Sequence, residues 1–272
     1  MSKTWFITGA GRGLGEEFVK AALSRGDRVA ATARNTEALG ELVDKYKTAI
    51  LPLALDVTDR EAVFAAVETA RAAFGGLDVV VNNAGYGLFG AIEEVSAEQF
   101  RQQLDVNVLG PFHVTQAVLP VLREQGHGHI IQISSTGGVV AFPLLGTYNA
   151  SKWALEAFSE SLAAEVARFG IKVTLVEPGA YGTDWSGSSA IRAEGQPQYQ
   201  PVREALAAAS AKNPRYEPAH AGAAILAVAD ADQPPLRVFF GAAALGAIEG
   251  TYQSRLQTWR EGQDISALAE GR

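Results

Sequence analysis

The chain has 272 residues, of which 47% are hydrophobic and 19% are charged, and its formal net charge is -7. This composition excludes a disordered chain, and the length allows one large domain with a sizeable core. The negative charge argues against a nucleic-acid surface, and no apolar run approaches the ~18 residues that span a bilayer, so we expect neither nucleic acid nor membrane as a partner.

Short apolar runs rich in β-branched and aromatic residues alternate with longer helical patterns. This alternation is typical of βαβ units and predicts a Rossmann-type α/β fold, a doubly wound, seven-stranded parallel sheet flanked by helices in a single domain. The predicted strands are Lys3–Thr8, Arg28–Ala33, Ala49–Leu55, Leu77–Val81, His129–Ser134, Lys172–Val176 and Leu236–Phe240. The predicted helices are Leu14–Ser24, Glu37–Tyr46, Arg60–Phe74, Ala97–Arg123, Tyr148–Phe169 and Ala219–Ala229, the fourth with a bend near Gly110-Pro111.

The segment from about 180 to 218 departs from this alternation. It follows the sixth predicted strand and contains Tyr181, Trp185 and Tyr199 among prolines and glycines. An insertion there emerges at the carboxyl edge of the sheet, where open α/β folds bind ligands, so we interpret it as a substrate lid. The alternative is a surface excursion whose aromatic side chains pack on the body.

Metal and disulfide chemistry have no support in the sequence. The chain has no cysteine, and its four histidines lack the H-E-x-x-H spacing of a zinc site, so we expect no disulfide and no metal. The N-terminus enters glycine-rich sequence after a very short apolar stretch and has no signal-peptide pattern, which predicts a cytoplasmic protein.

A glycine-rich turn, TGAGRGLG, joins the first predicted strand to the first predicted helix. Glycines in that context let backbone amides approach a pyrophosphate at the helix N-terminus, so the turn predicts dinucleotide binding. A simple strand-to-helix turn is the alternative. The cofactor contacts expected from it are Gly9, Gly11, Arg12, Gly13, Leu14 and Gly15.

The end of the second predicted strand indicates which dinucleotide binds. An acidic residue there would accept hydrogen bonds from a free ribose 2′-hydroxyl, whereas an arginine would pair with a 2′-phosphate. This chain has Arg34 there, and Arg12 in the glycine turn can approach the same phosphate. The two arginines predict NADP(H), unless either is an ordinary solvated charge.

Tyr148 and Lys152, in the stretch YNASK, lie four residues apart and share one helix face. A phenol with an ordinary pKa near ~10 is a poor proton donor at neutral pH unless a nearby cation stabilises its phenolate. The Lys152 ammonium could supply that cation, although an aromatic residue and a lysine also fall four apart by chance.

Taken together, these motifs resemble those of the classical short-chain dehydrogenase/reductase family, over Lys3 to about Gly241. TGAGRGLG is similar to the family's T-G-x-x-x-G-x-G turn, Asn82-Asn83-Ala84-Gly85 to its N-N-A-G element, and the Tyr148/Lys152 pair to its Y-x-x-x-K. Because the three motifs occur in the family's order, the resemblance is specific.

The resemblance implies a set of site residues. The implied catalytic residues are Asn107, Ser135, Tyr148 and Lys152, where Ser135 is preferred to Ser134 because it lies thirteen residues before Tyr148, the family's usual interval. Further implied cofactor contacts are Asp56, Val57, Asn83, Ala84, Gly85, Tyr148, Lys152, Pro178, Gly179 and Thr183. The expected substrate contacts are Ser135, Tyr148, Tyr181 and Trp185.

The activity that the resemblance implies is an NADP(H)-dependent oxidoreductase that interconverts a carbonyl and a secondary alcohol by hydride transfer. Tyr148 would be the general acid/base, Ser135 would hydrogen-bond the substrate oxygen, and Lys152 would depress the Tyr148 pKa and hold the nicotinamide ribose. Asn107 would support a water that replenishes the proton. The alternatives are a non-catalytic NADP(H)-binding sensor or regulator, and an epimerase or dehydratase of the wider superfamily.

The same resemblance implies self-association, as a homodimer or homotetramer, through the helices around 97–123 and 148–169. Residues 1–241 would form the NADP-binding catalytic domain with its lid at about 180–218. Residues 242–272 would continue the same domain as a helical tail. The substrate would be a small carbonyl or alcohol compound that the sequence does not specify.

Overall fold

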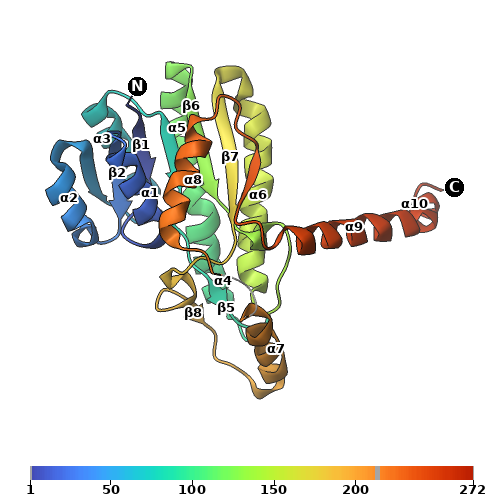
Figure 1. Ribbon diagram of the computed structural model, residues 1–272. Helices are drawn as coiled ribbons and strands as arrows, with labels where there is room; N and C mark the ends of the chain where they lie inside the picture. The colour runs from blue at the N-terminus through green and yellow to red at the C-terminus, as the bar shows by residue number, and fades with distance from the viewer. Residues whose placement is uncertain (1, 212–214, 272) are drawn as a thin grey trace.

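The computed structural model describes residues 2–211 and 215–271. Seven parallel strands form one sheet in the order β3-β2-β1-β4-β6-β7-β9 (Figure 1). The strands are β1 (Thr4–Ile7), β2 (Arg28–Ala33), β3 (Ile50–Ala54), β4 (Val79–Asn82), β6 (Gly128–Ile133), β7 (Ile171–Pro178) and β9 (Arg237–Phe240). The order reverses between β1 and β4, which is the point where open α/β sheets bind ligands at their carboxyl edge. The predicted Rossmann-type sheet is therefore confirmed.

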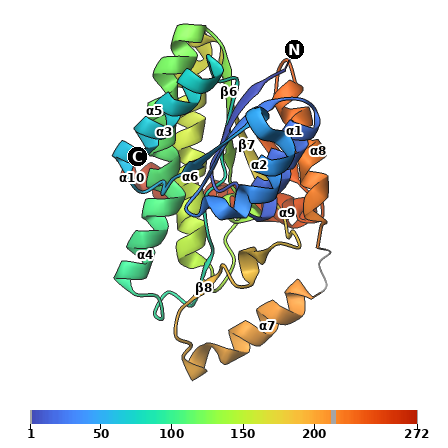
Figure 2. The same cartoon turned by 90° about the vertical axis from the view of Figure 1, so that its left-hand side faces the viewer.

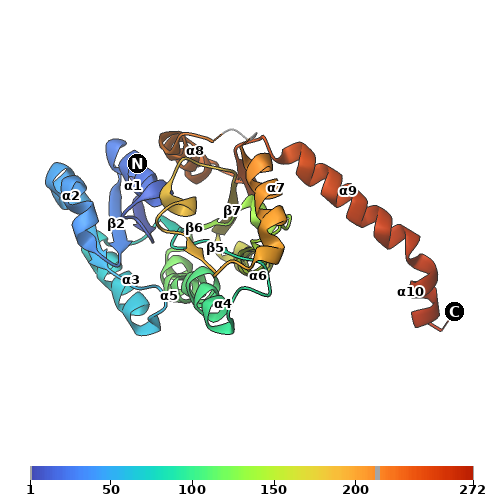
Figure 3. The same ribbon diagram turned by 90° about the horizontal axis from the view of Figure 1, so that it is seen from below.

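Helices cover both faces of this sheet. They are α1 (Gly13–Ser24), α2 (Gly40–Tyr46), α3 (Arg60–Phe74), α4 (Ala97–Leu104), α5 (Gly110–Gln125), α6 (Gly146–Val166) and α8 (Pro218–Asp230). Figures 1 and 3 show α1 and α8 on one face and α3, α5 and α6 on the other. Two apolar cores result, one around Trp5 and Phe18 under α1 and α8, the other around Phe6 and Leu122 under α3 and α5.

Local sequence signals explain where several helices begin and end. Asp59 precedes α3 and its carboxylate accepts a hydrogen bond from the Ala62 N–H at 3.0 Å. The same helix ends at Gly75, whose φ of 82° is the left-handed conformation that glycine adopts without a steric penalty. Ser96 and Gln99 form a capping box at the start of α4.

The helix predicted over 97–123 is two α-helices joined by a π-helical turn, η3 (Asp105–Leu109). The regular α-helix is thus interrupted five residues before Gly110, not bent at Gly110-Pro111 as the proline suggested. Pro111 lies in the first turn of α5, where its missing N–H is tolerated. A Cβ on Gly110 would lie 2.6 Å from Cγ2 of Val57, so only glycine fits where α5 begins.

The segment predicted as a lid lies beyond the carboxyl ends of the strands, at the end of the sheet opposite the N-terminus (Figures 1 and 2). It contains η6 (Asp184–Ser186), β8 (Ile191–Arg192), η7 (Pro197–Tyr199) and α7 (Gln200–Ser210). β8 pairs in parallel with β5 (Leu88–Phe89), a strand too short to give a periodic pattern in the sequence. Residues 212–214 of the predicted lid, and the terminal residues 1 and 272, lie outside the described residues.

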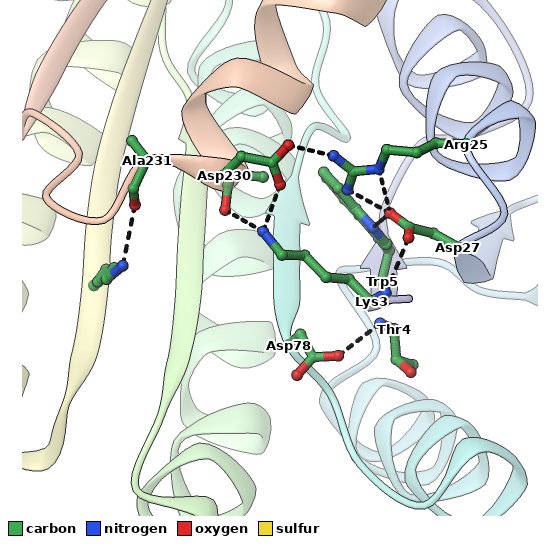
Figure 4. Close-up of polar contacts among 10 residues, drawn as sticks. Lys3, Thr4, Trp5, Arg25, Asp27, Asp78, Asp230 and Ala231 are labelled. Carbon is green, nitrogen blue, oxygen red and sulfur yellow. Dashed lines mark hydrogen bonds and ion pairs between the residues drawn. The ribbon is translucent and has the colours of Figure 1, made fainter. Parts of the chain in front are cut away.

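A polar cluster ties the first strand to α8 at the amino end of the sheet (Figure 4). Buried Asp27 accepts hydrogen bonds from the Lys3 backbone N–H at 2.9 Å and the Trp5 indole N–H at 2.8 Å. Arg25 donates to both Asp27 and Asp230, and the Lys3 ammonium reaches Asp230 at 2.6 Å. These charges lie at the opposite end of the strands from the ligand-binding edge and anchor the end of α8.

The chain ends in two helices, α9 (Leu245–Glu261) and α10 (Gln263–Ala269). Figures 1 and 3 show α9 projecting away from the body. Its first turns are held by buried Ile248, which packs with Val139 and Val140. Among residues 2–211 and 215–271, no helix has the length and apolar character needed to cross a bilayer.

Candidate active site

The glycine turn forms a tight cradle at the N-terminus of α1. Gly9 and Gly13 have φ values of 65° and 58°, which favour glycine. A Cβ on Gly15 would lie 2.3 Å from the Gly9 carbonyl oxygen, so a side chain cannot be accommodated there. Leu14 lies half-buried between these glycines. The bare backbone and the positive end of the helix dipole suit the pyrophosphate of a dinucleotide.

The predicted N-N-A-G element contacts this turn directly. The Asn83 amide donates to the carbonyl oxygens of Thr8 and Gly9, both at 3.0 Å. The Thr8 hydroxyl accepts from the backbone N–H groups of Asn83 and Ala84 at 3.0 and 3.1 Å. Thr8 is therefore the link between the two motifs, a role that only its place at the start of TGAGRGLG could have indicated.

The segment that contains Arg12 and the segment that contains Arg34 are neighbours at this edge. A Cβ on Gly11 would lie 3.4 Å from the Cβ of Ala33, so the glycine turn runs against the end of β2. Both arginine side chains are exposed, and neither makes a hydrogen bond or ion pair with any described residue. Two uncompensated guanidinium groups suit an anionic group such as a phosphate.

The residues expected at the adenine follow β3. The Asp56 carboxylate is exposed and accepts from the Thr58 N–H at 2.9 Å and the Thr58 hydroxyl at 2.8 Å. Val57 is buried, and its carbonyl oxygen lies 3.2 Å from Nδ1 of His113. This loop is therefore held firmly at the same carboxyl edge as the glycine turn.

The residues expected beside the nicotinamide follow β7. β7 ends at Pro178, and the Gly179 N–H donates to the Phe240 carbonyl oxygen at 3.0 Å. A Cβ on Gly13 would lie 3.6 Å from Cβ of Thr183. The start of the lid and the glycine turn are thus neighbours, as expected if one cofactor contacts both.

Tyr148 is buried in the first turn of α6 and lies next to Ser135. A Cβ on Gly137 would be 3.2 Å from Cε1 of Tyr148 and 3.4 Å from Oγ of Ser135. Burial raises the pKa of Tyr148 to about 12, and the Ser135 hydroxyl opposes that rise. The alternative residue, Ser134, is buried with its Oγ against Gly138, so Ser135 is the serine beside Tyr148.

Lys152 is buried below Tyr148, with Nζ 6.0 Å from the centre of the Tyr148 ring. Its ammonium donates to the Ile133 carbonyl oxygen at 2.8 Å, and a Cβ on Gly85 would lie 3.7 Å from Nζ. Burial lowers the pKa of Lys152 to about 8, although the charge of the Glu156 carboxylate acts to raise it. The expected acidification of Tyr148 by Lys152 is not found in the protein alone, because burial of the phenol raises its pKa.

Asn107 is fully buried in the π-helical turn. Its amide nitrogen donates to the Tyr86 carbonyl oxygen at 3.1 Å and the Ser151 hydroxyl at 3.0 Å, and its oxygen accepts from the Tyr86 N–H at 3.1 Å. These bonds hold the loop after β4 against α6. Tyr86 and Ser151 are thus further residues of this site, and no sequence motif singles out either as a partner of Asn107.

One of the lid aromatics reaches Tyr148. The Trp185 ring centroid lies 4.9 Å from that of Tyr148 and 5.3 Å from that of Phe89, both in edge-to-face contacts. Tyr181 instead packs on the core under α1 and α8, with its ring centroid 5.5 Å from that of Tyr216. The structure therefore brings Trp185 to Tyr148 and packs Phe89 on Trp185, and it directs the ring contacts of Tyr181 elsewhere.

A buried carboxylate fastens the segment predicted as a lid to the body. Glu94, which follows β5, accepts from the Arg203 guanidinium at 2.5 Å and the Gln196 N–H at 2.6 Å. These hydrogen bonds lower the pKa of Glu94 to about 2, and the bond from Arg203 has the largest effect. Tyr199 donates to Glu93 at 2.6 Å and so belongs to this attachment. No local sequence pattern could have indicated it, because the partners are 109 residues apart along the chain.

A family model described as short chain dehydrogenase matches residues 3–193, well over half of the chain. The chain belongs to the short-chain dehydrogenase family. A curated relative, "Oxidoreductase BOA17" of Botryotinia fuckeliana, is 43% identical over 268 residues, 96% of this chain and 98% of its own length. A solved short-chain dehydrogenase from Streptomyces avermitilis superposes with a TM-score of 0.90 at 39% identity, and 98% of each chain is covered.

Solved structures similar to this short-chain dehydrogenase contain nicotinamide dinucleotides. One from Burkholderia phymatum, in complex with NAD, has a TM-score of 0.80 at 26% identity, covering 94% of this chain and 95% of the other. An alcohol dehydrogenase from Thermococcus sibiricus, complexed with 5-hydroxy-NADP, has a TM-score of 0.73 at 27% identity, covering 88% and 96%. Relatives thus include binders of either dinucleotide.

Proposed function

We propose that this short-chain dehydrogenase interconverts a carbonyl compound and a secondary alcohol with NADP(H) as the cofactor. The observation that carries the proposal is the buried phenol of Tyr148, with the Ser135 hydroxyl beside it and the Lys152 ammonium below it. A proton donor, an oxygen-binding hydroxyl and a cation are the groups that carbonyl reduction requires of a protein.

The cofactor preference rests on Arg12 and Arg34. Their guanidinium groups are exposed and free of partners among the described residues, at the end of β2 where a 2′-phosphate would lie. The glycine turn would hold the pyrophosphate. Asp56 would flank the adenine ring and Pro178 the nicotinamide ring, together with the other residues expected at this edge. The nicotinamide, when bound, supplies or accepts the hydride.

Tyr148 would donate its proton to the substrate oxygen during reduction. With its pKa raised to about 12, the phenol carries its proton at neutral pH, which is the form that reduction needs. Ser135 would hydrogen-bond the same oxygen, and the Lys152 ammonium would favour the phenolate that proton transfer leaves. A single well-placed acid or oxyanion donor contributes roughly 10²–10⁴ in rate. Asn107 would hold the loop and helix that frame Lys152, and support the water that returns the proton.

We propose an apolar substrate. The aromatic ring of Trp185, from the lid, borders Tyr148, and the ring of Phe89, from β5, packs on Trp185. Aromatic side chains bind apolar groups through their large faces and offer few hydrogen bonds to sugars or acids. Ser135, Tyr148 and Trp185 are therefore the proposed substrate contacts, and Tyr181 is not among them.

We also propose that the protein self-associates through α5 and α6. Leu109, Phe112 and Trp153 are large apolar side chains that lie exposed on the π-helical turn and these two helices. Large apolar side chains exposed on neighbouring helices are typical of subunit interfaces. Light scattering coupled to gel filtration should give a homodimer or homotetramer, and a monomer would contradict the proposal.

A fluorescence titration with NADPH and NADH tests the cofactor assignment. We expect tighter binding of NADPH, and loss or reversal of that preference in Arg34→Asp. A panel of apolar ketones is then assayed with NADPH, comparing the parent protein with Tyr148→Phe. Turnover should fall by roughly 10²–10⁴ in the variant while its NADPH affinity is kept. Equal turnover of the two proteins would exclude Tyr148 as the acid, and tighter binding of NADH would overturn the arginine argument.

A further inference from the structure

Charged side chains gather around Lys152 and Glu156 on α6. Glu156 follows Lys152 by one turn of α6, and both side chains are almost fully buried. Arg237 on β9 donates from Nε to the Glu156 carboxylate at 3.0 Å. Glu177 on β7 is 1% exposed, and its Oε1 lies 3.8 Å from the same Nε. Lys152, Glu156 and Glu177 are buried, whereas Arg237 lies exposed at the start of β9 and reaches Glu156 from there. A protein interior normally tolerates charge only in compensated sets.

The two carboxyl groups compete for their cation. Burial raises the pKa of Glu156, while the Ser134 hydroxyl and the charges of Arg237 and Lys152 lower it. Burial and the Glu156 charge raise the pKa of Glu177 to about 7, although the charge of Arg237 acts to lower it. Arg237 donates to Glu156 and lies farther from Glu177, so the geometry favours Glu156 as the ionised carboxylate of the pair.

We propose that Glu156 is a positioning residue for the proton-transfer step, because its carboxylate is the counter-ion that keeps the Lys152 amine protonated beside Tyr148. Arg237 keeps Glu156 ionised by holding one of its oxygens. This inference rests on the proposed function of Tyr148 and Lys152.

The other groups around Lys152 do not replace Glu156 in this role. On α6 itself, Tyr148 is neutral at physiological pH, and Glu160 is exposed and pairs with the outer nitrogen of Arg237 at 2.6 Å. The neighbouring β6 segment offers the neutral Ile133 carbonyl and the Ser134 hydroxyl, and the π-helical turn offers the neutral amide of Asn107. Glu156 is the carboxylate whose charge acts on the Lys152 amine.

The pH dependence of turnover provides the first test. Turnover falls as Lys152 loses its proton, since the phenolate left on Tyr148 then loses its cation. Glu156→Gln removes the counter-ion, so we expect the alkaline limb of kcat to move to lower pH by about one unit or more. The KM for NADPH at low pH, where Lys152 is still charged, should stay near that of the parent.

Two matched variants separate this role from a general packing effect. Glu177→Gln removes the other buried carboxyl group while Glu156 remains, so the alkaline limb should move much less than in Glu156→Gln. Glu160→Gln changes the exposed partner of Arg237 and should leave the limb unchanged. A downward shift of similar size in Glu156→Gln and Glu177→Gln would show that any disturbance of the cluster has this effect, and the proposal would fail.

A second readout does not need turnover. The protonation of Lys152 can be followed by NMR of lysine labelled at Cε, with its signal assigned by its absence in Lys152→Met. In Glu156→Gln the midpoint of that titration should lie about one pH unit or more below that of the parent. An unchanged midpoint would overturn the role of Glu156 even in an active enzyme. A lowered midpoint in a protein that reduces no carbonyl compound would instead contradict the proposed function and leave the Lys152–Glu156 coupling standing.

Discussion

The indole ring of Trp185 meets the phenol ring of Tyr148 edge to face, with 4.9 Å between ring centroids and 61° between ring planes. Tyr148 belongs to α6, whereas Trp185 belongs to the segment after β7. A Cβ on Gly87 would lie 2.7 Å from the Trp185 ring, so that loop also fits closely around the indole. The contact therefore couples the lid to the proposed proton donor, and the burial of Tyr148 depends partly on it.

Replacing Trp185 with alanine should remove the aromatic ring that packs on Tyr148. We expect the KM for an apolar ketone to rise about tenfold, because an aromatic contact and its buried area together contribute on the order of 1–3 kcal/mol. Relief of burial should also lower the Tyr148 pKa from about 12, which ultraviolet titration of the phenol can follow. Trp185→Phe is the control and should retain most of the affinity. An unchanged KM in Trp185→Ala would place the substrate elsewhere.

The sequence predicts most of this architecture because its signals are local. Strands such as Arg28–Ala33 and helices such as Arg60–Phe74 have the bounds expected from apolar runs and from capping residues such as Asp59. The glycine turn and the Tyr148/Lys152 pair are likewise short motifs. The structure brings both to the carboxyl edge, as parallel strands require.

Contacts between distant segments could not be predicted in this way. The pairing of β5 with β8 and the Glu94–Arg203 bond join segments about one hundred residues apart, with no pattern in either segment to signal it. The π-helical turn at Asp105–Leu109 could not be predicted from the sequence, because its apolar spacing resembles that of an α-helix. Glu156 did carry a signal, since it follows Lys152 by the same four residues that separate Tyr148 from Lys152.

Gly15→Ala should abolish dinucleotide binding. The new Cβ would lie 2.3 Å from the Gly9 carbonyl oxygen and 2.5 Å from the Asn83 amide, so the turn would have to open. We expect no detectable fluorescence response to NADPH or NADH, together with a lower melting temperature. Gly40→Ala is the matched control, because a Cβ on Gly40 meets no described atom within 4 Å. Parent-like binding in Gly15→Ala would mean that the turn does not form the cofactor cradle.

Glu94→Gln should loosen the lid while the sheet stays intact. The neutral amide weakens the bond to Arg203. It keeps only one acceptor oxygen, so the bonds now made to Oε1 by Arg203 and the Gln196 N–H and to Oε2 by the Ala91 N–H cannot all be kept. Hydrogen exchange should quicken in residues 196–210 and remain unchanged in the strands. Glu98→Gln, an exposed change on α4, serves as the control. Protection of 196–210 equal to that of the parent would show that β8 alone holds the lid.

The buried His129 should make the protein less stable in acid. Its Nε2 lies 2.9 Å from the Thr174 hydroxyl, and burial, assisted by the charges of Lys172 and Lys3, lowers the pKa of His129 to about 3. The unfolded chain, with an ordinary histidine pKa near 6.5, therefore binds a proton between pH 6.5 and 3 that the folded protein does not. Stability is full above pH 6.5 and falls with pH in that window, by ~1.4 kcal/mol per unit and about 5 kcal/mol in total.

Urea unfolding at intervals between pH 7 and pH 4 measures this dependence. His129→Gln keeps a hydrogen-bonding group but cannot take up the proton, so its free energy of unfolding should vary less with pH than that of the parent, whatever its value at pH 7. His220→Gln, at an exposed position on α8, should reproduce the parent's slope. If the slope persists in His129→Gln, the acid sensitivity comes from other groups, because only removal of the titrating imidazole changes the difference in bound protons.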